Sequence, residues 1–337
     1  MSWFRPGQKQ ISRRSLLKGA ISVGSGIMLL QTGVSPAQQA GRAQRLTYRF
    51  VNRTGGAFGD DQCFWSLNDG RDWHSFAKEP TADCPIGNGR VYFRLGAAPK
   101  NLDDRRAYWD FIEYAYGNGT WHGNTTQVDA FCIPMTIELG DKKLGIVQSR
   151  SKRFETFRSQ APKEFQTCAK SDFFILSPCR AGFGKDGPNG KYFDSYIDTV
   201  WRQYATEKKT PSGQWTGKVV DGALIFTPLH VGKPLRCDRK PTTQDVFLGT
   251  GVLGGNPQFC AAINRHVLAD PADWRNSAKF YQAEPCNWYS KFLHEHSLDH
   301  KAYGFCYDDV SEQAAFFSGK GQNLTVTLYW DRKPDNQ

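Results

Sequence analysis

The sequence has nine cysteines but no two of them are separated by only two residues. Zinc ribbons and thioredoxin-like sites are built on such pairs, so neither explains these cysteines. Internal repeats and low-complexity linkers are also missing, and no apolar run reaches the roughly 18 residues that predict a membrane-spanning helix. These absences leave a globular protein, and 337 residues are enough for one large or two ordinary domains.

Acidic residues are absent from residues 1–43, which hold six of the 43 lysines and arginines. The formal net charge of +10 is therefore concentrated at the N-terminus. The rest of the chain has 37 basic and 33 acidic residues, a formal net charge of +4. No basic stripe of the kind that contacts nucleic acid is present, so we expect no nucleic-acid partner.

The N-terminal 43 residues have the pattern of a twin-arginine export signal. Residues 12–18, SRRSLLK, carry the arginine pair, and an apolar segment over about 19–34 follows. Small residues suited to cleavage come next, and cuts after Ala37, Ala40 or Ala43 all fit. We therefore expect a bacterial protein that folds before export and is periplasmic or secreted, with no membrane attachment once the signal is removed. The alternative is a basic tail with a short anchor helix.

An exported protein can oxidise its cysteines, so the sequence predicts several disulfides. The odd number leaves at least one free thiol, and Cys132, inside an apolar strand, is the candidate. The sequence offers no metal motif either. His294-Glu295-His296 lacks two histidines four positions apart, so a helix would direct its histidines away from each other. We expect His296 to line a groove or to be structural, and we expect no metal or organic cofactor.

Aromatic residues make up 14% of the chain and glycine is abundant, which favours a β-rich fold with many turns. Alternation predicts strands over 46–52, 63–67, 91–95, 145–148 and 324–330, and Asp221-Gly222 predicts a hairpin turn. Apolar residues at helical spacing over 192–204 predict the clearest helix. Shorter helices are expected over 152–159, 257–268, 271–281 and 286–300.

These elements predict a mainly β fold with a mixed α/β part. Residues 44–150 would form a β-barrel or sandwich, residues 151–320 a mixed α/β part, and residues 321–337 a C-terminal strand that returns to a sheet. Both parts would share one core.

Residues 108–139 contain two candidate catalytic acids. Two runs rich in aromatic and β-branched residues flank Gly117-Asn118-Gly119, the pattern of a hairpin. Side chains alternate along a strand, so Glu113 shares one side with Trp109, Phe111 and Ala115. Asp129 shares one side of the second run with Gln127, Phe131 and Ile133. If the runs pair, Glu113 and Asp129 are cross-strand neighbours or close to it.

Two carboxyls in an aromatic cleft can hydrolyse a glycosidic bond. One donates a proton to the leaving oxygen, and the other attacks or activates water. The register, and with it the separation that distinguishes retention from inversion, does not follow from the sequence. The alternative is that each acid binds a turn amide or a neighbouring arginine. Tyr307 and Asp308 have two interpretations as well, since they could line a groove or bind a cation, or cap the following turn.

The segment from 108 to 139 resembles glycoside hydrolase family 64, a family of bacterial β-1,3-glucanases related in fold to thaumatin-like proteins. The resemblance rests on the sixteen-residue step between Glu113 and Asp129 and on residues 128–135, VDAFCIPM. Further agreement, in the family's order, comes from 192–204, from CAAINR at 260–265, from HEHSLD at 294–299 and from YGFCYDDV at 303–310. The match covers nearly the whole chain after the signal.

This resemblance implies a β-barrel domain and an α/β domain that form a wide groove. It implies endo-type hydrolysis of β-1,3-glucan with inversion and release of short oligosaccharides, by a protein expected to be a monomer. Glu113 matches the family's general acid and Asp129 its general base. Thr126 and the loop with Trp121 match positions near the groove. We also expect Asn124, His296, Tyr307 and Asp308 to be candidate substrate contacts. The chain departs from the family at Ala115 and Gly117, where polar sugar-contacting residues are expected.

Two rival hypotheses remain at this point. The chain could be a thaumatin-like module that binds glucan without hydrolysing it. It could also be a structural periplasmic protein in which both carboxylates are salt-bridged.

Overall fold

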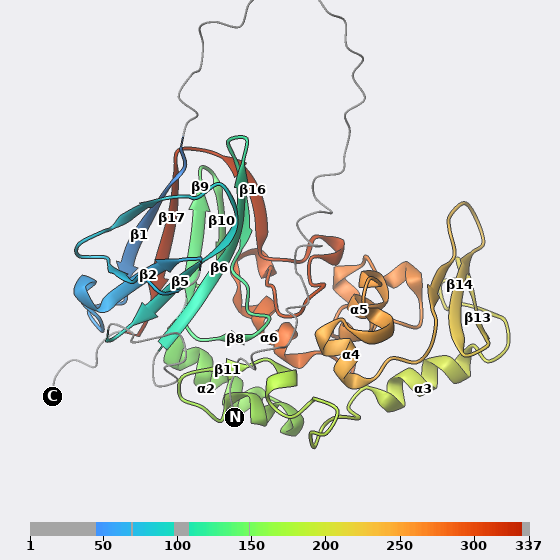
Figure 1. Ribbon diagram of the computed structural model, residues 1–337. Coiled ribbons are helices and arrows are strands. Elements are labelled where there is room, and N and C mark those ends of the chain that lie inside the picture. The colour runs from blue at the N-terminus through green and yellow to red at the C-terminus, as the bar shows by residue number, and fades with distance from the viewer. Residues whose placement is uncertain (1–44, 69, 98–107, 148, 332–337) are drawn as a thin grey trace, which may run out of the picture.

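A computed structural model describes residues 45–331, except residues 69, 98–107 and 148. Two β-sheets form one end of the molecule, and helices with a small sheet extend away from it (Figure 1). The predicted export signal lies outside the described residues. None of the described helices is long and apolar enough to cross a membrane.

The first sheet has five strands. Their spatial order is β10 (Lys142–Gly145), β9 (Met135–Leu139), β17 (Asn323–Tyr329), β1 (Thr47–Arg53) and β4 (Thr81–Asp83). The C-terminal strand β17 lies between β9 and β1 and runs parallel to β1. The two ends of the described chain are therefore hydrogen-bonded side by side in one sheet.

The second sheet has six strands and carries Glu113. Their order is β16 (Phe316–Lys320), β7 (Thr120–Asn124), β6 (Tyr108–Gly117), β5 (Gly87–Leu95), β2 (Cys63–Leu67) and β3 (His74–Ser75). The predicted hairpin is confirmed, since β6 and β7 pair across Asn118-Gly119. Both turn residues have positive φ, 51° and 70°, as the tightest hairpin turn requires.

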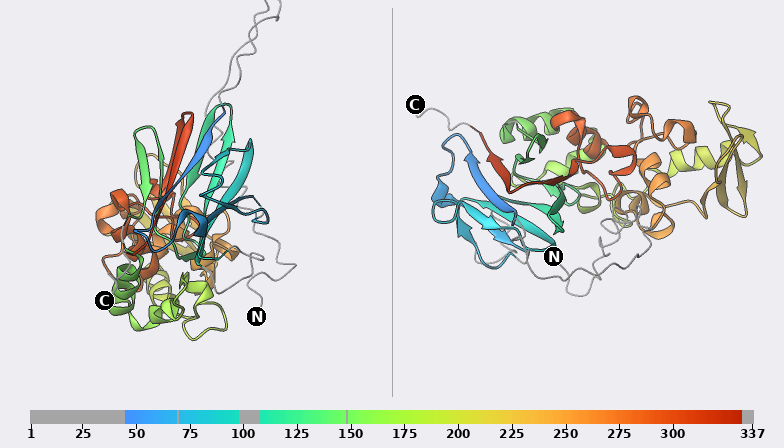
Figure 2. Two further views of the ribbon diagram at one scale, coloured as in Figure 1. Left: turned by 90° about the vertical axis from the view of Figure 1, so that its left-hand side faces the viewer. Right: turned by 90° about the horizontal axis from the view of Figure 1, so that it is seen from above.

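The two sheets pack face to face around one apolar core (Figure 2). Alternate residues of each strand point into it, because side chains alternate across a pleated sheet. Tyr48 and Phe50 of β1, for example, meet Tyr114 of β6 and Trp65 of β2 there. This core fixes the register of β6 and therefore the side of the sheet on which Glu113 lies.

A second apolar core lies among the helices and short strands of the rest of the chain, so the prediction that both parts share one core is wrong. The helices are α2 (Arg150–Gln160), α3 (Asp194–Gln203), α4 (Thr243–Leu248), α5 (Pro257–Asn264) and α6 (Trp288–His296). The strands are β8 (Ala130–Phe131), β11 (Ile175–Leu176), β12 (Lys208–Lys209), β13 (Trp215–Val220), β14 (Ala223–Pro228) and β15 (Leu235–Cys237). The predicted stripe of α3 is confirmed, with Ile197, Val200 and Trp201 buried.

Three predictions are wrong. The strand predicted over 145–148 does not form, because β10 ends at Gly145 and residues 146 and 147 lie outside any strand. Residues 271–281 form no α-helix but two 3₁₀ turns, Pro271–Asp273 and Ser277–Lys279. The expected disulfides are also not found, because all nine cysteines are free thiols. Seven of them are buried, and burial raises the pKa of thiols such as Cys63 and Cys132 to about 12. Most of these cysteines therefore serve as small apolar core residues.

Candidate active site

Glu113 lies on the face of β6 that points away from the sandwich core. Across the sheet, β5 places Arg90 directly opposite Glu113 and Tyr92 opposite Phe111. Trp109 continues the row, with its ring 6.3 Å from that of Phe111. Glu113 thus follows a row of aromatic rings on one sheet face, as the alternation of β6 predicts.

Arg90 forms an ion pair with Glu113 across the two strands. Its Nη2 and Nε atoms lie 2.8 Å and 3.2 Å from the same carboxylate oxygen, Oε1. The guanidinium also sits 4.3 Å from the centre of the Phe111 ring, which orients it. Burial acts to lower the pKa of Arg90, but the neighbouring Glu113 and Tyr92 raise it overall. The Glu113 side chain remains 21% exposed.

Asp129 is not a cross-strand neighbour of Glu113, so that part of the prediction is wrong. The residue opposite Glu113 is Asn124, the last residue of β7. The second predicted run does not form one strand, because it is divided into β7, β8 and β9. Asp129 lies in the connection just before β8, five positions beyond Asn124.

Asp129 has an arginine partner of its own. Arg180 Nη2 lies 2.9 Å from Asp129 Oδ1, and the Asp129 side chain is 31% exposed. The backbone oxygen of Asp129 accepts a hydrogen bond from Ser177 N at 3.1 Å. Both candidate acids are therefore partly exposed and paired with arginine.

Two buried tyrosines hold the connection between the acids. Gln127 N donates to the Tyr303 backbone oxygen at 2.9 Å, and Tyr289 Oη donates to the Gln127 oxygen at 2.6 Å. Burial raises the pKa of both tyrosines, and nearby charges add to the effect. Asp129 is among the charges acting on Tyr289, and Glu113 is among those acting on Tyr303. Both acids therefore lie within electrostatic reach of the tyrosine pair that holds Gln127.

Of the predicted substrate-contacting residues, Asn124 is the last residue of β7 and Thr126 lies in the connection that follows it. Asn124 is paired with Glu113 across β6 and β7. Thr126 is buried, with only 2% of its surface exposed. Side-chain oxygens of Asn124, Thr125 and Gln127 are buried without a hydrogen-bond partner among the described residues. The end of β7 and the connection after it therefore contain three such buried, unpaired polar oxygens.

Trp121 was expected near the groove, but it is fully buried. Its indole Nε1 donates to Tyr48 Oη at 3.1 Å, and its ring packs against Phe317 inside the sandwich. The predicted sugar contact is wrong, because the alternation of side chains along β7 places Trp121 on the side that faces the core. A ring with no exposed surface cannot stack on a sugar.

Asp308 was also expected to line the groove, and it too is fully buried. Its carboxylate binds the Arg265 guanidinium at 3.1 Å and His294 Nε2 at 3.0 Å. Ser290 Oγ and Gly304 N donate to it at 2.8 Å and 2.9 Å. Asp308 is therefore the centre of a buried polar network that leaves no surface for substrate.

His296 and Tyr307, the remaining predicted contacts, are partly exposed. His296 stacks on Phe292 at the end of α6, with its Nδ1 2.8 Å from the Phe292 backbone oxygen. Tyr307 Oη accepts a hydrogen bond from Gly255 N at 3.0 Å. No group of three or more histidines, cysteines or acids in the described ranges is arranged to hold a metal ion.

Sequence reasoning missed the residues that surround the two acids. Arg90 alternates with the apolar residues of β5, so the sequence predicts on which side of the strand it lies. The sequence does not predict that its partner is Glu113. Arg180 has no local signal, because it lies in a 3₁₀ turn, Pro178–Arg180, about fifty positions from Asp129. Only the tertiary structure brings these residues to the acids.

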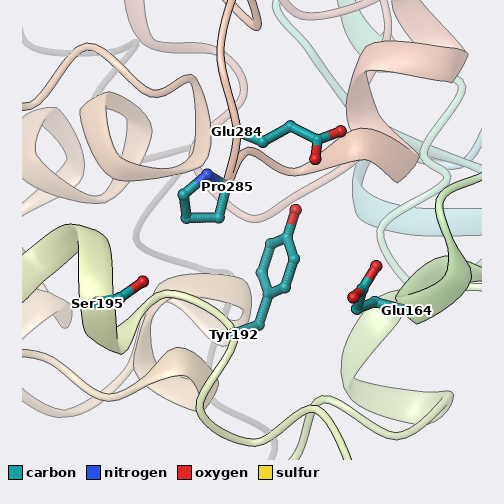
Figure 3. Close-up of a pocket in the computed structure, with 5 residues that line it drawn as sticks. All are labelled: Glu164, Tyr192, Ser195, Glu284 and Pro285. Carbon is teal, nitrogen blue, oxygen red and sulfur yellow. The ribbon is translucent and has the colours of Figure 1, made fainter.

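A separate cavity of about 240 Å³ lies in the helical part of the molecule. Glu164, Tyr192, Ser195, Glu284 and Pro285 line it, and Figure 3 shows Tyr192 between the two glutamates. The Tyr192 hydroxyl donates to the Cys286 backbone oxygen at 3.1 Å. Neither Glu113 nor Asp129 lines this cavity, so it is distinct from the candidate site.

Known proteins resemble the chain across both sheets and helices. The model of glycoside hydrolase family 64, described as β-1,3-glucanase, matches residues 86–328. A glucan endo-1,3-beta-glucosidase of Cellulosimicrobium cellulans is 25% identical in an alignment of 300 residues that covers 74% of this chain and 53% of that protein. The chain thus spans about half the length of this curated relative.

Solved structures agree with this match. A β-1,3-glucanase domain from Clostridium beijerinckii aligns with a TM-score of 0.74 and 26% identity, over 88% of this chain and 100% of that one. A laminaripentaose-producing β-1,3-glucanase from Paenibacillus barengoltzii, complexed with laminarihexaose, aligns with a TM-score of 0.68 and 25% identity, over 85% and 75% of the two chains. The family match covers well over half of the chain and includes both Glu113 and Asp129. The chain therefore belongs to glycoside hydrolase family 64.

Proposed function

We propose that this protein is an endo-acting β-1,3-glucan hydrolase that inverts the anomeric configuration and uses Glu113 as acid and Asp129 as base. The observation that carries the proposal is the pair of partly exposed carboxylates, each held by an arginine, within the segment that matches the family. The printed activities of the relatives support the choice of substrate.

In the proposed reaction, Glu113 gives its proton to the glycosidic oxygen as the bond to the anomeric carbon breaks. Asp129 accepts a proton from a water molecule, whose oxygen forms the new bond on the opposite face. Room for that water requires carboxyl groups roughly 6.5–9.5 Å apart in the substrate complex.

The two arginines have different roles in this proposal. The Arg180 cation favours the ionised form of Asp129, which a general base needs. Arg90 orients the Glu113 side chain, because its Nη2 and Nε atoms both contact Oε1, at 2.8 Å and 3.2 Å. No cofactor takes part in either step.

The substrate in this proposal is a laminarin- or curdlan-type glucan, and the products are short laminari-oligosaccharides. We also propose that the sandwich and the helical part are two domains of the thaumatin-like kind with a wide groove between them. Asn124, Thr126, His296 and Tyr307 remain candidates for contacts with the glucan. The protein would act as a monomer, after export by the twin-arginine route to the periplasm or the medium.

The proposal is tested by incubating the purified protein with laminarin and with curdlan. Chromatography measures the product length, and NMR of the first products measures their anomeric configuration. We expect oligosaccharides in the α configuration from the wild type and none from Glu113→Gln or Asp129→Asn. Glu138→Gln is the matched control, because Glu138 is an exposed strand carboxylate paired with Lys143 at 3.2 Å on the other sheet. Full turnover in either acid variant would remove that residue from its role.

A second candidate is a glucan-binding protein without catalysis. It is favoured by the ion pairs, since both carboxylates already have arginine partners. Retention of the wild type on curdlan, with no reducing sugar released from curdlan or laminarin, would select this function.

A further inference from the structure

Asp110 is a buried acid that the proposed reaction does not use. It lies on β6 three positions before Glu113, on the opposite face of the strand, and is 5% exposed. Phe111 N donates to its Oδ1 atom at 3.0 Å. Cys132 N and Ile133 N both donate to its Oδ2 atom, at 3.1 Å and 3.2 Å. One carboxylate therefore connects the strand of Glu113 with the segment that follows Asp129.

The same segment is held from its other side. Arg150 Nε donates to the Cys132 oxygen at 3.0 Å, and Ser177 N donates to the Asp129 oxygen at 3.1 Å. Between these points β8 pairs with β11. Residues 129–133 are thus bound to the helical part through Arg150 and β11, and to β6 through Asp110.

We propose that Asp110 is a positioning residue, which fixes residues 129–133 to β6 and so sets the separation between Asp129 and Glu113. This inference rests on the proposed roles of these two acids. The ten-residue strand β6 carries both Asp110 and Glu113, and β8 alone separates Asp129 from the two amides that Asp110 binds. Displacing those amides therefore displaces the base relative to the acid. A misplacement of about 1 Å can lower a catalytic rate about 100-fold.

The test variant follows from the hydrogen-bond geometry. All three partners of Asp110 are N–H donors, and both carboxylate oxygens accept from them. In Asp110→Asn one oxygen becomes an NH₂ group, which accepts nothing. Either Phe111 N or the pair Cys132 N and Ile133 N then faces a donor, so the connection is weakened with little change in volume.

Asp270 provides a matched control. It is 4% exposed, and its oxygens accept from Ser212 N at 2.6 Å and from Ala272 N at 3.1 Å. It lies beside β12 and β13, in the other core. Asp270→Asn therefore makes the same chemical change at a similar buried site that does not contact residues 129–133.

Laminarin turnover by the full chain is measured for the wild type and both variants at a temperature at which all are folded. We expect Asp110→Asn to lower kcat about 100-fold with KM within about twofold, and Asp270→Asn to leave both within about twofold. Equal losses of kcat in the two variants, or a kcat within twofold of wild type in Asp110→Asn, would overturn the proposal. If Asp110→Asn does not fold, Asp110→Glu replaces it, because its carboxylate is kept but moved by one methylene. An unchanged kcat in Asp110→Glu would likewise refute it.

Hydrogen–deuterium exchange of peptides covering residues 127–134 gives a readout that does not need activity. We expect faster exchange in Asp110→Asn than in Asp270→Asn. If the wild type itself hydrolyses no glucan, the proposed function fails, and the exchange still reports on the segment. Unchanged exchange there would show that Asp110 does not hold it.

Discussion

Replacing Asp308 with asparagine should unfold the protein more readily without changing how it binds glucan. The prediction separates the two roles considered for this residue, because the sequence suggested a groove contact and the structure shows a buried network. Asp308 has no exposed surface, and its carboxylate is bound by Arg265, His294, Ser290 and Gly304 N. Its removal leaves the Arg265 guanidinium, 1% exposed, without a counter-charge.

The size of the effect follows from that burial. Removing one partner of a buried ion pair costs about 3–5 kcal/mol, because the remaining charge is desolvated and unpaired. A midpoint of about 4 kcal/mol is a large part of the roughly 5–15 kcal/mol by which folded proteins are stable. With an unfolding entropy of about 2.1 cal/mol/K per residue, roughly 290 folded residues give about 0.6 kcal/mol/K, so Tm should fall by about 5–8 °C.

The assay combines thermal unfolding with laminarin kinetics below both transitions. Asp299→Asn is the control, since Asp299 is exposed just beyond α6 and its φ of 53° suits asparagine. We expect the control to keep the wild-type Tm and Asp308→Asn to keep the wild-type KM. If Asp308→Asn has the wild-type Tm and a raised KM, Asp308 contacts the substrate and its role in the buried network is refuted.

Two further predictions concern the core and the same buried network. Trp121→Phe should lower Tm and leave KM for laminarin unchanged, because the indole packs inside the sandwich and donates to Tyr48. A raised KM at unchanged Tm would show instead that Trp121 contacts the substrate. The Tm difference between wild type and Asp308→Asn should be largest between about pH 4 and pH 6.5. Burial acts to raise the pKa of Asp308, but His294 and Arg265 lower it overall, so its contribution to stability is lost as the pH falls below about 4. Burial acts to lower the pKa of His294, but Asp308 raises it overall, so its contribution is complete below about pH 6.5 and is lost as the pH rises through the raised pKa. A Tm difference that does not vary with pH would contradict this account.

The sequence predicts the parts of the site that depend on neighbouring residues. Alternation and Asn118-Gly119 are enough to predict the hairpin of β6 and β7, because period and turn geometry are local properties. The helical stripe of α3 is local in the same way. Membership of the family was also readable from the order of several motifs.

The prediction failed where distant residues decide the structure. Residues 125–128, TTQV, have strand propensity, but Gln127 binds Tyr289 and Tyr303 instead of a neighbouring strand. The second strand therefore ends at Asn124, and Asp129 is moved out of the hairpin. Alternation correctly divided β7 into two sides, but it did not reveal that the side of Trp121 faces the core. The predicted disulfides rested on expected export to an oxidising compartment, but pairing depends on distances that a sequence does not contain, and the nine cysteines are free thiols.

The arginine partners of Glu113 and Asp129 agree with a catalytic role better than with a structural one. The same chain shows what a structural ion pair looks like, since Arg265 and Asp308 are 1% and 0% exposed and have further partners on both sides. Glu113 and Asp129 are 21% and 31% exposed, and ion pairs with this much access to solvent contribute about 0–1 kcal/mol to folding. A β-branched residue at position 113 would suit the strand at least as well. Solvent reaches both carboxylates, and the proposed proton transfer to a bound glucan requires carboxyl groups that substrate can reach.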